Sequence, residues 1–191
     1  NPDGALTLFV DTFRVYSSDL QGNGLKAVID EDEKSGNNYI AEIAHSQNNK
    51  FVYAYVPSTG NRDMQIKIAN ADGSGKKVLK TMATNVSIDN LYSFGGKIFY
   101  YTNSNSSGTY VNELRSMNED GSNDIKENLP RPSMMAKNGS AYISTSTDYT
   151  STTPSTSYYV ARFKDGKWDE AGSFKLPKIT DLVRAEAIST D

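Results

Sequence analysis

The chain has 191 residues, a net charge of −3 at pH 7 and no cysteine. This balance excludes a global basic field directed at nucleic acid or at an anionic membrane. The lack of thiols excludes disulfides, thiolate metal sites and cysteine catalysis. No apolar run approaches the ~18 residues of a membrane-spanning helix, so no direct membrane span is expected.

The composition favours an all-β, loop-rich protein of the extracytoplasmic type. Twelve tyrosines and 14 glycines accompany many Ser, Thr and Asn residues, which are the residue types of strands and turns. The chain opens with Asn-Pro-Asp-Gly rather than with Met, so we expect a processed or excised segment.

The first expected strands are residues 6–10, 13–17 and 25–29, with a turn at Gly22. An acidic segment, DEDEKSGNN at residues 30–38, follows them. Its alternating oxygen ligands resemble a calcium loop, but Gly is not at the sixth position and Glu is not at the twelfth. We therefore predict a solvated connection, with calcium binding as the alternative.

The next unit contains short strands at residues 39–44 and 51–56, followed by a hairpin at 64–79, MQIKIANADGSGKKVL. In the strand FVYAYV, alternate residues place three aromatic side chains on one face and Val, Ala and Val on the other. Because both faces are apolar, we expect this strand to pack against a neighbouring sheet on each side. An Asp-Gly pair between two apolar strands is a strong hairpin signal.

This order of elements repeats twice more along the chain. Strands at residues 86–92 and 97–102 precede a hairpin at 111–125, and strands at 133–136 and 141–145 precede one at 158–171. The hairpin glycines are separated by 51, 48 and 45 residues (73−22, 121−73, 166−121): Gly22, Gly73, Gly121 and Gly166. A second turn, NNK, GGK or NGS, repeats in phase with them. Such a period predicts a propeller blade.

We predict an all-β fold, a β-propeller of four-stranded antiparallel blades with about four blades in this chain. The chain is treated as one domain, 1–191, with blade units near 5–29, 39–80, 86–128 and 133–176 and a terminal strand at 185–190. With the strands of a blade called a to d, the first unit contains only b, c and d, and 185–190 is similar to a strand a. A small closed ring and part of a ring of six to eight blades both remain open.

The hairpins resemble the repeats of TolB-like bacterial propellers. IKIANADGSGKKVL and LRSMNEDGSNDIKENL match that pattern well, FRVYSSDLQGNGLKAV loosely and VARFKDGKWDEAGSF least. The motif is structural and transfers no catalytic residue. A weaker resemblance is to the propeller-type surface lipoproteins that Bacteroidetes pair with TonB-dependent transporters. These resemblances imply a location in the periplasm or on the cell surface and an outer-membrane transporter as a partner.

Candidate chemistry is sparse, so we predict no catalytic residue, no metal site and no cofactor. His45 is the only histidine, which excludes a histidine cluster or a His-based triad within the chain. The acidic run at 30–33 lies on one loop, whereas a glycosidase pair faces a sugar from two sides. Trp168 follows Asp165-Gly166 but does not fit the sialidase Asp-box, and we expect it to pack between blades.

The connections at one end of the blades vary between the repeats, whereas the turns at the other end are short and regular, and this difference favours the variable end for binding. In a propeller the b–c loops and the d–a connections emerge on the same face. Here the b–c segments are 57–63, 103–110 and 145–157, and the d–a segments are 30–38, 80–85 and 128–131. Binding residues concentrate on long loops of a rigid scaffold. We predict that this face binds through Arg62, Tyr110, Arg131 and Tyr149, although unconstrained surface loops would show the same variation.

The predicted function is a non-catalytic, extracytoplasmic binding or scaffolding module for a protein partner or a small polar ligand. No nucleic-acid partner is expected. The alternative is the non-catalytic propeller portion of a larger enzyme, such as a peptidase or a glycoside-processing protein.

Overall fold

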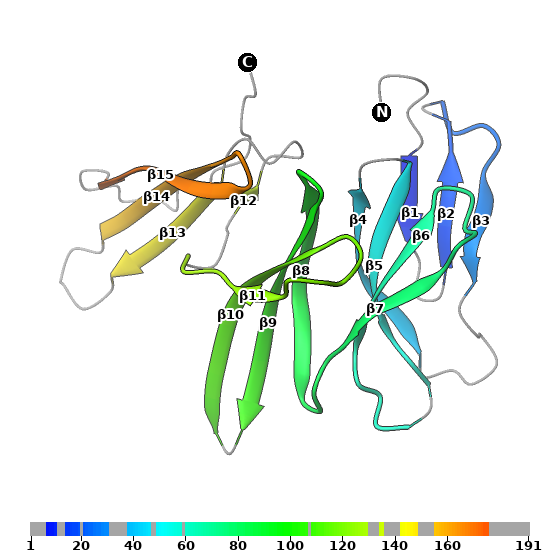
Figure 1. Cartoon of the computed structure of the whole chain (residues 1–191), viewed down its shortest axis with the longest axis horizontal. Coiled ribbons are helices and arrows are strands. Elements are labelled where there is room, and N and C mark those ends of the chain that lie inside the picture. The colour runs from blue at the N-terminus through cyan, green and yellow to red at the C-terminus, as the bar shows by residue number, and fades with distance from the viewer. Residues whose placement is uncertain are drawn as a thin grey trace. The chain divides into compact units, whose positions relative to one another are not determined.

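The computed structural model of the chain describes residues 7–10, 14–19, 21–30, 38–46, 49–58, 60–106, 108–129, 134–135, 142–148 and 155–175. The chain divides into two compact units, 1–128 and 129–191. The described residues form strands and turns, and no helix that could cross a membrane occurs among them. Figure 1 shows the strands of each unit.

The first unit contains three antiparallel sheets, each built of strands consecutive in the chain. The first sheet has three strands: β1 (Thr7–Val10), β2 (Arg14–Ser18) and β3 (Lys26–Asp30). The second has four: β4 (Tyr39–Ser46), β5 (Lys50–Val56), β6 (Gln65–Asn70) and β7 (Lys77–Thr81). The third has four: β8 (Val86–Phe94), β9 (Lys97–Ser106), β10 (Thr109–Asn118) and β11 (Ile125–Lys126).

The second unit contains one four-stranded antiparallel sheet. Its strands are β12 (Met134–Met135), β13 (Tyr142–Asp148), β14 (Ser155–Lys164) and β15 (Lys167–Lys175). The predicted all-β blade strands are therefore confirmed, and within the described residues the first sheet contains the strands expected as b, c and d. Whether 1–191 is a single propeller domain stays a prediction, and the predicted strand at 185–190 lies outside the described residues.

Strand β5 packs on both of its faces, as its sequence predicts. Phe51, Tyr53 and Tyr55 join Val15 and Ile29 of the first sheet in one apolar cluster. The opposite face joins β8 and β9 of the third sheet through a second cluster that contains Val52, Ala54, Val56, Ile98 and Tyr100. Because full burial of one large apolar side chain contributes about 1.5–3 kcal/mol, these two clusters hold the three sheets face to face.

The c–d turns of the second and third sheets share one hydrogen-bonding pattern. The Gly73 N–H donates to the Asn70 carbonyl at 2.8 Å, and the Gly121 N–H donates to the Asn118 carbonyl at 2.9 Å. Both glycines have positive φ, 86° and 91°, a conformation that is unfavourable for residues with a Cβ. The turn of the first sheet closes similarly, since the Gly22 N–H donates to the Asp19 carbonyl at 3.1 Å.

Each of these two turn glycines lies against the outer strand of the preceding sheet. A Cβ on Gly73 would stand 1.7 Å from the Val28 carbonyl oxygen, and one on Gly121 would stand 3.0 Å from the Leu79 carbonyl oxygen. Val28 and Leu79 are the extra residues at the β-bulges of β3 and β7. The repeated glycine thus allows each turn to approach a bulge of its neighbour closely.

The turn between β14 and β15 is shorter than the other c–d turns, which explains why the sequence of this hairpin matches the repeat least. Lys164 pairs with Lys167, so only Asp165 and Gly166 form the loop. Both have positive φ, 51° and 78°, which is the type I′ geometry of a two-residue hairpin.

Candidate functional site

The two ends of the sheets in the first unit differ in character. Antiparallel order places the a–b and c–d turns at one end, called here the turn face, and the b–c and d–a connections at the other, called the loop face. On the turn face, the Ala71 N–H donates to the Asn49 carbonyl at 2.8 Å, which ties the a–b turn to the c–d turn. Together with the close approach of Gly73 and Gly121 to the preceding sheets, this bond shows that the turn face is used by structural contacts.

The β5–β6 connection at 57–64 lies on the loop face and carries Arg62. The side chain of Arg62 is exposed, and its φ of 58° lies in the left-handed region. A left-handed residue with a Cβ is strained by about 1–2 kcal/mol, and such strain is found most often at functional positions. Thr84 Oγ1 donates to the Asp63 carboxylate at 3.0 Å and thereby links this connection to the β7–β8 connection.

The predicted loop at 103–110 is instead a β-hairpin, which corrects the sequence-based assignment. Strands β9 and β10 pair without a register shift from Lys97 and Asn118 up to Ser106 and Thr109. Strand β8 pairs with β9 only as far as Ser104. The hairpin therefore continues two residue pairs past β8, Asn105 with Tyr110 and Ser106 with Thr109, and its end, residues 103–112, is called here the finger (Figure 1). A run of Asn, Ser and Thr indicates a loop by composition, but cross-strand pairing here satisfies the backbone groups of these residues.

The finger presents Tyr110, 67% exposed, and Val111, 45% exposed. Side chains of β9 brace it, since Thr102 Oγ1 and Ser104 Oγ each donate at 3.3 Å, to the carbonyls of Glu113 and Val111 respectively. A large aromatic side chain held on paired backbone loses little conformational freedom when it binds.

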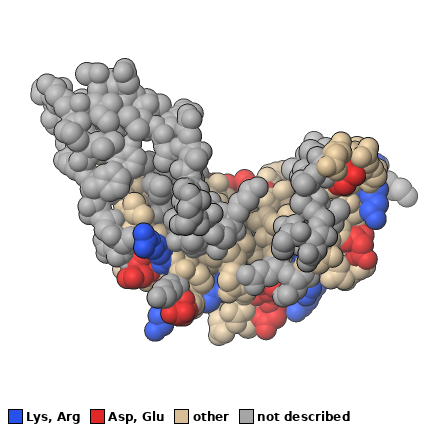
Figure 2. Space-filling model, turned by 90° about the horizontal axis from the view of Figure 1, so that it is seen from above, with Lys and Arg blue, Asp and Glu red and all other residues tan. Residues whose placement is uncertain are grey.

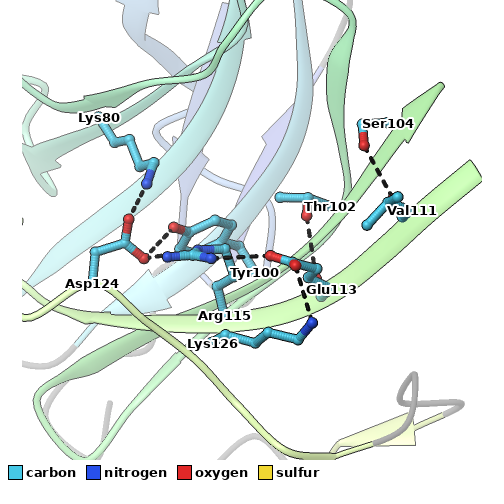
Figure 3. Close-up of polar contacts among 9 residues, drawn as sticks. All are labelled: Lys80, Tyr100, Thr102, Ser104, Val111, Glu113, Arg115, Asp124 and Lys126. Atoms are coloured by element: carbon cyan, nitrogen blue, oxygen red, sulfur yellow. Dashed lines mark hydrogen bonds and ion pairs between the residues drawn. The ribbon is translucent and has the colours of Figure 1, made fainter. Parts of the chain in front are cut away.

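An ionic network stands at the base of the finger (Figure 3). The Asp124 carboxylate accepts from the Tyr100 hydroxyl at 2.6 Å and from Arg115 Nε at 3.1 Å, and it pairs with Lys80 of β7. Arg115 Nη1 continues to the Glu113 carboxylate at 3.0 Å. The network therefore joins the second sheet to the third.

Glu113 also pairs with Lys126 of β11, whose Nζ lies 3.1 Å from its carboxylate. The hydrogen bonds from Lys126 and Arg115 lower the pKa of the Glu113 carboxyl, so it stays ionised at neutral pH. Every charged member of the network has a partner of opposite sign. We assign this network to anchoring the finger rather than to chemistry.

A carboxylate pair lies between the innermost strands of the second and third sheets. Burial raises the pKa of Glu42 on β4, and the charge of Asp89 on β8 raises it further. Both strands have a bulge here, with Ala41 and Asp89 as the extra residues. Two neighbouring carboxylates could attract a cation, but no group of three or more ligand-type residues that could hold a metal occurs in the described part of the chain.

The structure describes two of the four predicted binding residues. Arg62 and Tyr110 both lie on the loop face, whereas Arg131 and Tyr149 lie outside the described residues. The predicted loop at 145–157 is shorter than expected, because β13 extends to Asp148 and β14 begins at Ser155. Strand pairing of Ser and Thr residues again replaced a predicted loop.

Other residues named in the sequence analysis contact neighbours within the sheets. His45 lies in β4 opposite Phe51, and the Asp30 carboxylate lies 3.5 Å from Arg14 Nε. The rings of Trp168 and Phe163 pack edge to face, with their centroids 5.2 Å apart. Sequence reasoning missed Glu42, Asp89 and the network around Asp124, since nothing in the spacing of these residues indicates that they meet.

Charges of both signs are interspersed on the surface seen in Figure 2. Within the described residues of that view, no large area carries Lys and Arg alone. This distribution agrees with the small net charge of −3.

Comparison with known proteins supports the fold. No protein-family model and no curated protein matches the chain. The chain is similar to a prolyl endopeptidase structure, with a TM-score of 0.60 and 11% identity, over 95% of this chain and 28% of that one. It is also similar to an oligogalacturonate lyase in complex with manganese, with a TM-score of 0.51 and 16% identity, over 82% of this chain and 41% of the lyase.

Both similar structures are propeller-type proteins, and the all-β propeller fold predicted from the repeats is confirmed. The resemblance to TolB-like propellers is supported at the level of the fold. The chain spans less than half the length of either structure, 28% and 41%.

Proposed function

We propose that this chain is a non-catalytic binding module, located in the periplasm or on the cell surface, that holds a partner protein on its loop face. The observation that carries the proposal is the contrast between the two faces. The turn face is used by glycine turns that lie against neighbouring strands, whereas the loop face presents an exposed Tyr110 and a strained, exposed Arg62.

The chemistry of these two residues suits a protein surface. Tyr and Arg are enriched among the residues that dominate the binding energy of protein interfaces. The finger positions Tyr110 on paired strands, and the Asp124 network fixes the finger to the sheet below it. Arg131 and Tyr149 belong to the same proposed face, and an outer-membrane transporter fits as the partner.

The test is retention of partners by immobilised protein from an envelope extract of the source organism. The variants are Arg62→Gly and Tyr110→Ser, compared with the wild type and with Val78→Ser, a change at an exposed residue of β7. Glycine favours the φ of 58° at position 62, so Arg62→Gly removes the guanidinium without straining the turn. A partner lost by both loop-face variants and kept by Val78→Ser supports the proposal.

Oligogalacturonate serves as the small-ligand probe, since one similar structure is named for that sugar. Calorimetry could show that the wild type binds this sugar and that Arg62→Gly does not, while no protein partner is retained. That result would identify the ligand of the loop face as a small polar molecule rather than a protein. Equal retention of every protein by all four chains would contradict a binding role for the loop face.

The second candidate is the propeller portion of a larger enzyme. It is favoured by one observation: both similar structures are enzymes, and the chain covers only 28% and 41% of their lengths. The test compares this chain with a longer product of the same gene, using proline-containing peptides and oligogalacturonate as substrates. Turnover by the longer product alone would assign this chain to a supporting role within an enzyme.

A further inference from the structure

The outer edge of the finger has backbone groups that point away from its partner strand. The Leu114 carbonyl accepts from the Glu127 N–H of the outer neighbour at 2.8 Å. Backbone groups alternate in direction along a strand, so those of Asn112 and Tyr110 point to the same outer edge. Strand β11 covers this edge only at Arg115 and Ser116, and the chain bends at residues 128–129. No other strand pairs with this edge of residues 109–113 in the described part of the first unit.

The other outer edges of this unit carry features that prevent strand pairing. Strand β3 has Lys26 and a bulge at Val28, and β7 has Lys77, Lys80 and a bulge at Leu79. Lysines and bulges are the usual protection of free edges. The edge from Thr109 to Asn112 has no lysine, proline or bulge, and its side chains are exposed.

We infer that this edge pairs with the same edge of a second copy of the chain, in antiparallel register about a twofold axis at Val111. In this register Tyr110 stands opposite Asn112 of the other copy, and Val111 stands opposite Val111. Both residues whose backbone groups face outward then form hydrogen-bonded pairs, and the two valines form the closer, non-hydrogen-bonded pair.

Two features favour this register over its neighbours: the charges of the facing side chains and the backbone groups that are still free to accept hydrogen bonds. Glu113 stands opposite Thr109 of the other copy, so no like charges face each other. Moving the axis to Asn112 would place Tyr110 opposite Leu114, whose carbonyl is already occupied by Glu127. Moving it to Tyr110 would leave Glu113 opposite the tip of the hairpin and shorten the ladder. An isologous contact of this kind closes as a dimer.

This inference goes beyond the proposed function and does not depend on it, because its test needs no partner or ligand. The chain has no cysteine, so a single introduced thiol reports one position. Opposed residues of a non-hydrogen-bonded pair lie about 4.5 Å apart at Cα, within the range that a disulfide spans. We therefore expect Val111→Cys to form a disulfide-linked dimer on mild oxidation.

Two variants serve as controls for this disulfide. Val78→Cys changes a residue with the same 45% exposure on β7, and Tyr110→Cys places its thiols two residues out of register, beyond the ~7 Å limit of disulfide geometry. Dimer formation should be at least about tenfold faster for Val111→Cys than for either control, because paired strands hold the two thiols at high effective concentration.

A reversible measurement accompanies the disulfide. Sedimentation of the wild type should show concentration-dependent dimers, and Val111→Lys should abolish them by placing like charges opposite each other, whereas Val78→Lys should leave them unchanged. Equal rates for the three cysteine variants, or sedimentation as a monomer at all concentrations, would overturn the inference. Faster crosslinking of Tyr110→Cys would overturn the register.

Discussion

At the scale of single residues, the turn glycines combine two constraints. Gly22 and Gly73 have almost the same backbone conformation, with φ of 84° and 86°. They differ in surroundings, because nothing lies within 4 Å of a Cβ built on Gly22, while the Val28 carbonyl oxygen lies 1.7 Å from one built on Gly73. The pair therefore separates backbone strain from steric contact between sheets.

Gly73→Ala is expected to destabilise the protein more than Gly22→Ala. Both changes add a Cβ to a left-handed residue, which costs about 1–2 kcal/mol. Only Gly73→Ala also forces the turn away from β3 and opens the apolar cluster around Phe51 and Val15. Urea unfolding measures the difference, and equal losses for the two variants would show that the close contact with Val28 does not matter.

At the scale of elements, β4 and β8 bring two acidic side chains together. The raised pKa of Glu42 results first from burial and then from the charge of Asp89. Glu113 on β10 is the opposite case, because hydrogen bonds from Lys126 and Arg115 lower its pKa. The two glutamates should therefore give stability profiles of opposite slope with pH.

Glu42→Gln is expected to stabilise the protein at neutral pH. A folded-state pKa above the unfolded value of about 4.3 means that the folded chain binds the proton more tightly. The stability from Glu42 is then complete below that value and is lost as the pH rises through the folded pKa. Unfolding measured from acidic to neutral pH should show this loss in the wild type and not in Glu42→Gln.

Glu113→Gln is the control of opposite sign. The ionised carboxylate stabilises the fold above the unfolded pKa, and this contribution is lost as the pH falls through the lowered folded pKa. This variant should therefore be less stable than the wild type at neutral pH. A stability gain from both substitutions would point to general charge repulsion rather than to these local contacts.

At the scale of the whole molecule, the first sheet differs from the other three. It has three strands, and β1 pairs with β2 on one side only among the described residues. An unpaired edge strand exchanges its outward amides readily. Whether a further strand completes this sheet decides between a small closed ring and part of a larger one.

We expect the outward amides of β1 to exchange hydrogen much faster than those of β5, which is paired on both sides. Native-state exchange with residue resolution makes the comparison, with β5 as the internal standard. Strong protection of both β1 and residues 185–190, which lie outside the described residues, would instead support closure of the ring within this chain.

The sequence by itself determined the strand order, the four-stranded units and the two apolar faces of β5. These features follow from local alternation and from glycine turns, which are properties of neighbouring residues. The positive φ of Gly73 and Gly121 likewise belongs to a local turn pattern. The predicted loop at 103–110 is instead paired strand, because Asn, Ser and Thr favour a strand only when a partner strand lies beside them.

Only the tertiary structure decided which distant residues meet. Asp124 contacts Lys80, 44 residues earlier in the chain, and Glu42 lies near Asp89 because β4 and β8 are adjacent inner strands. The bulges that receive the turn glycines are likewise not evident from the repeat. Such contacts depend on the register and stacking of whole sheets, which a one-residue shift would change and which local patterns do not encode.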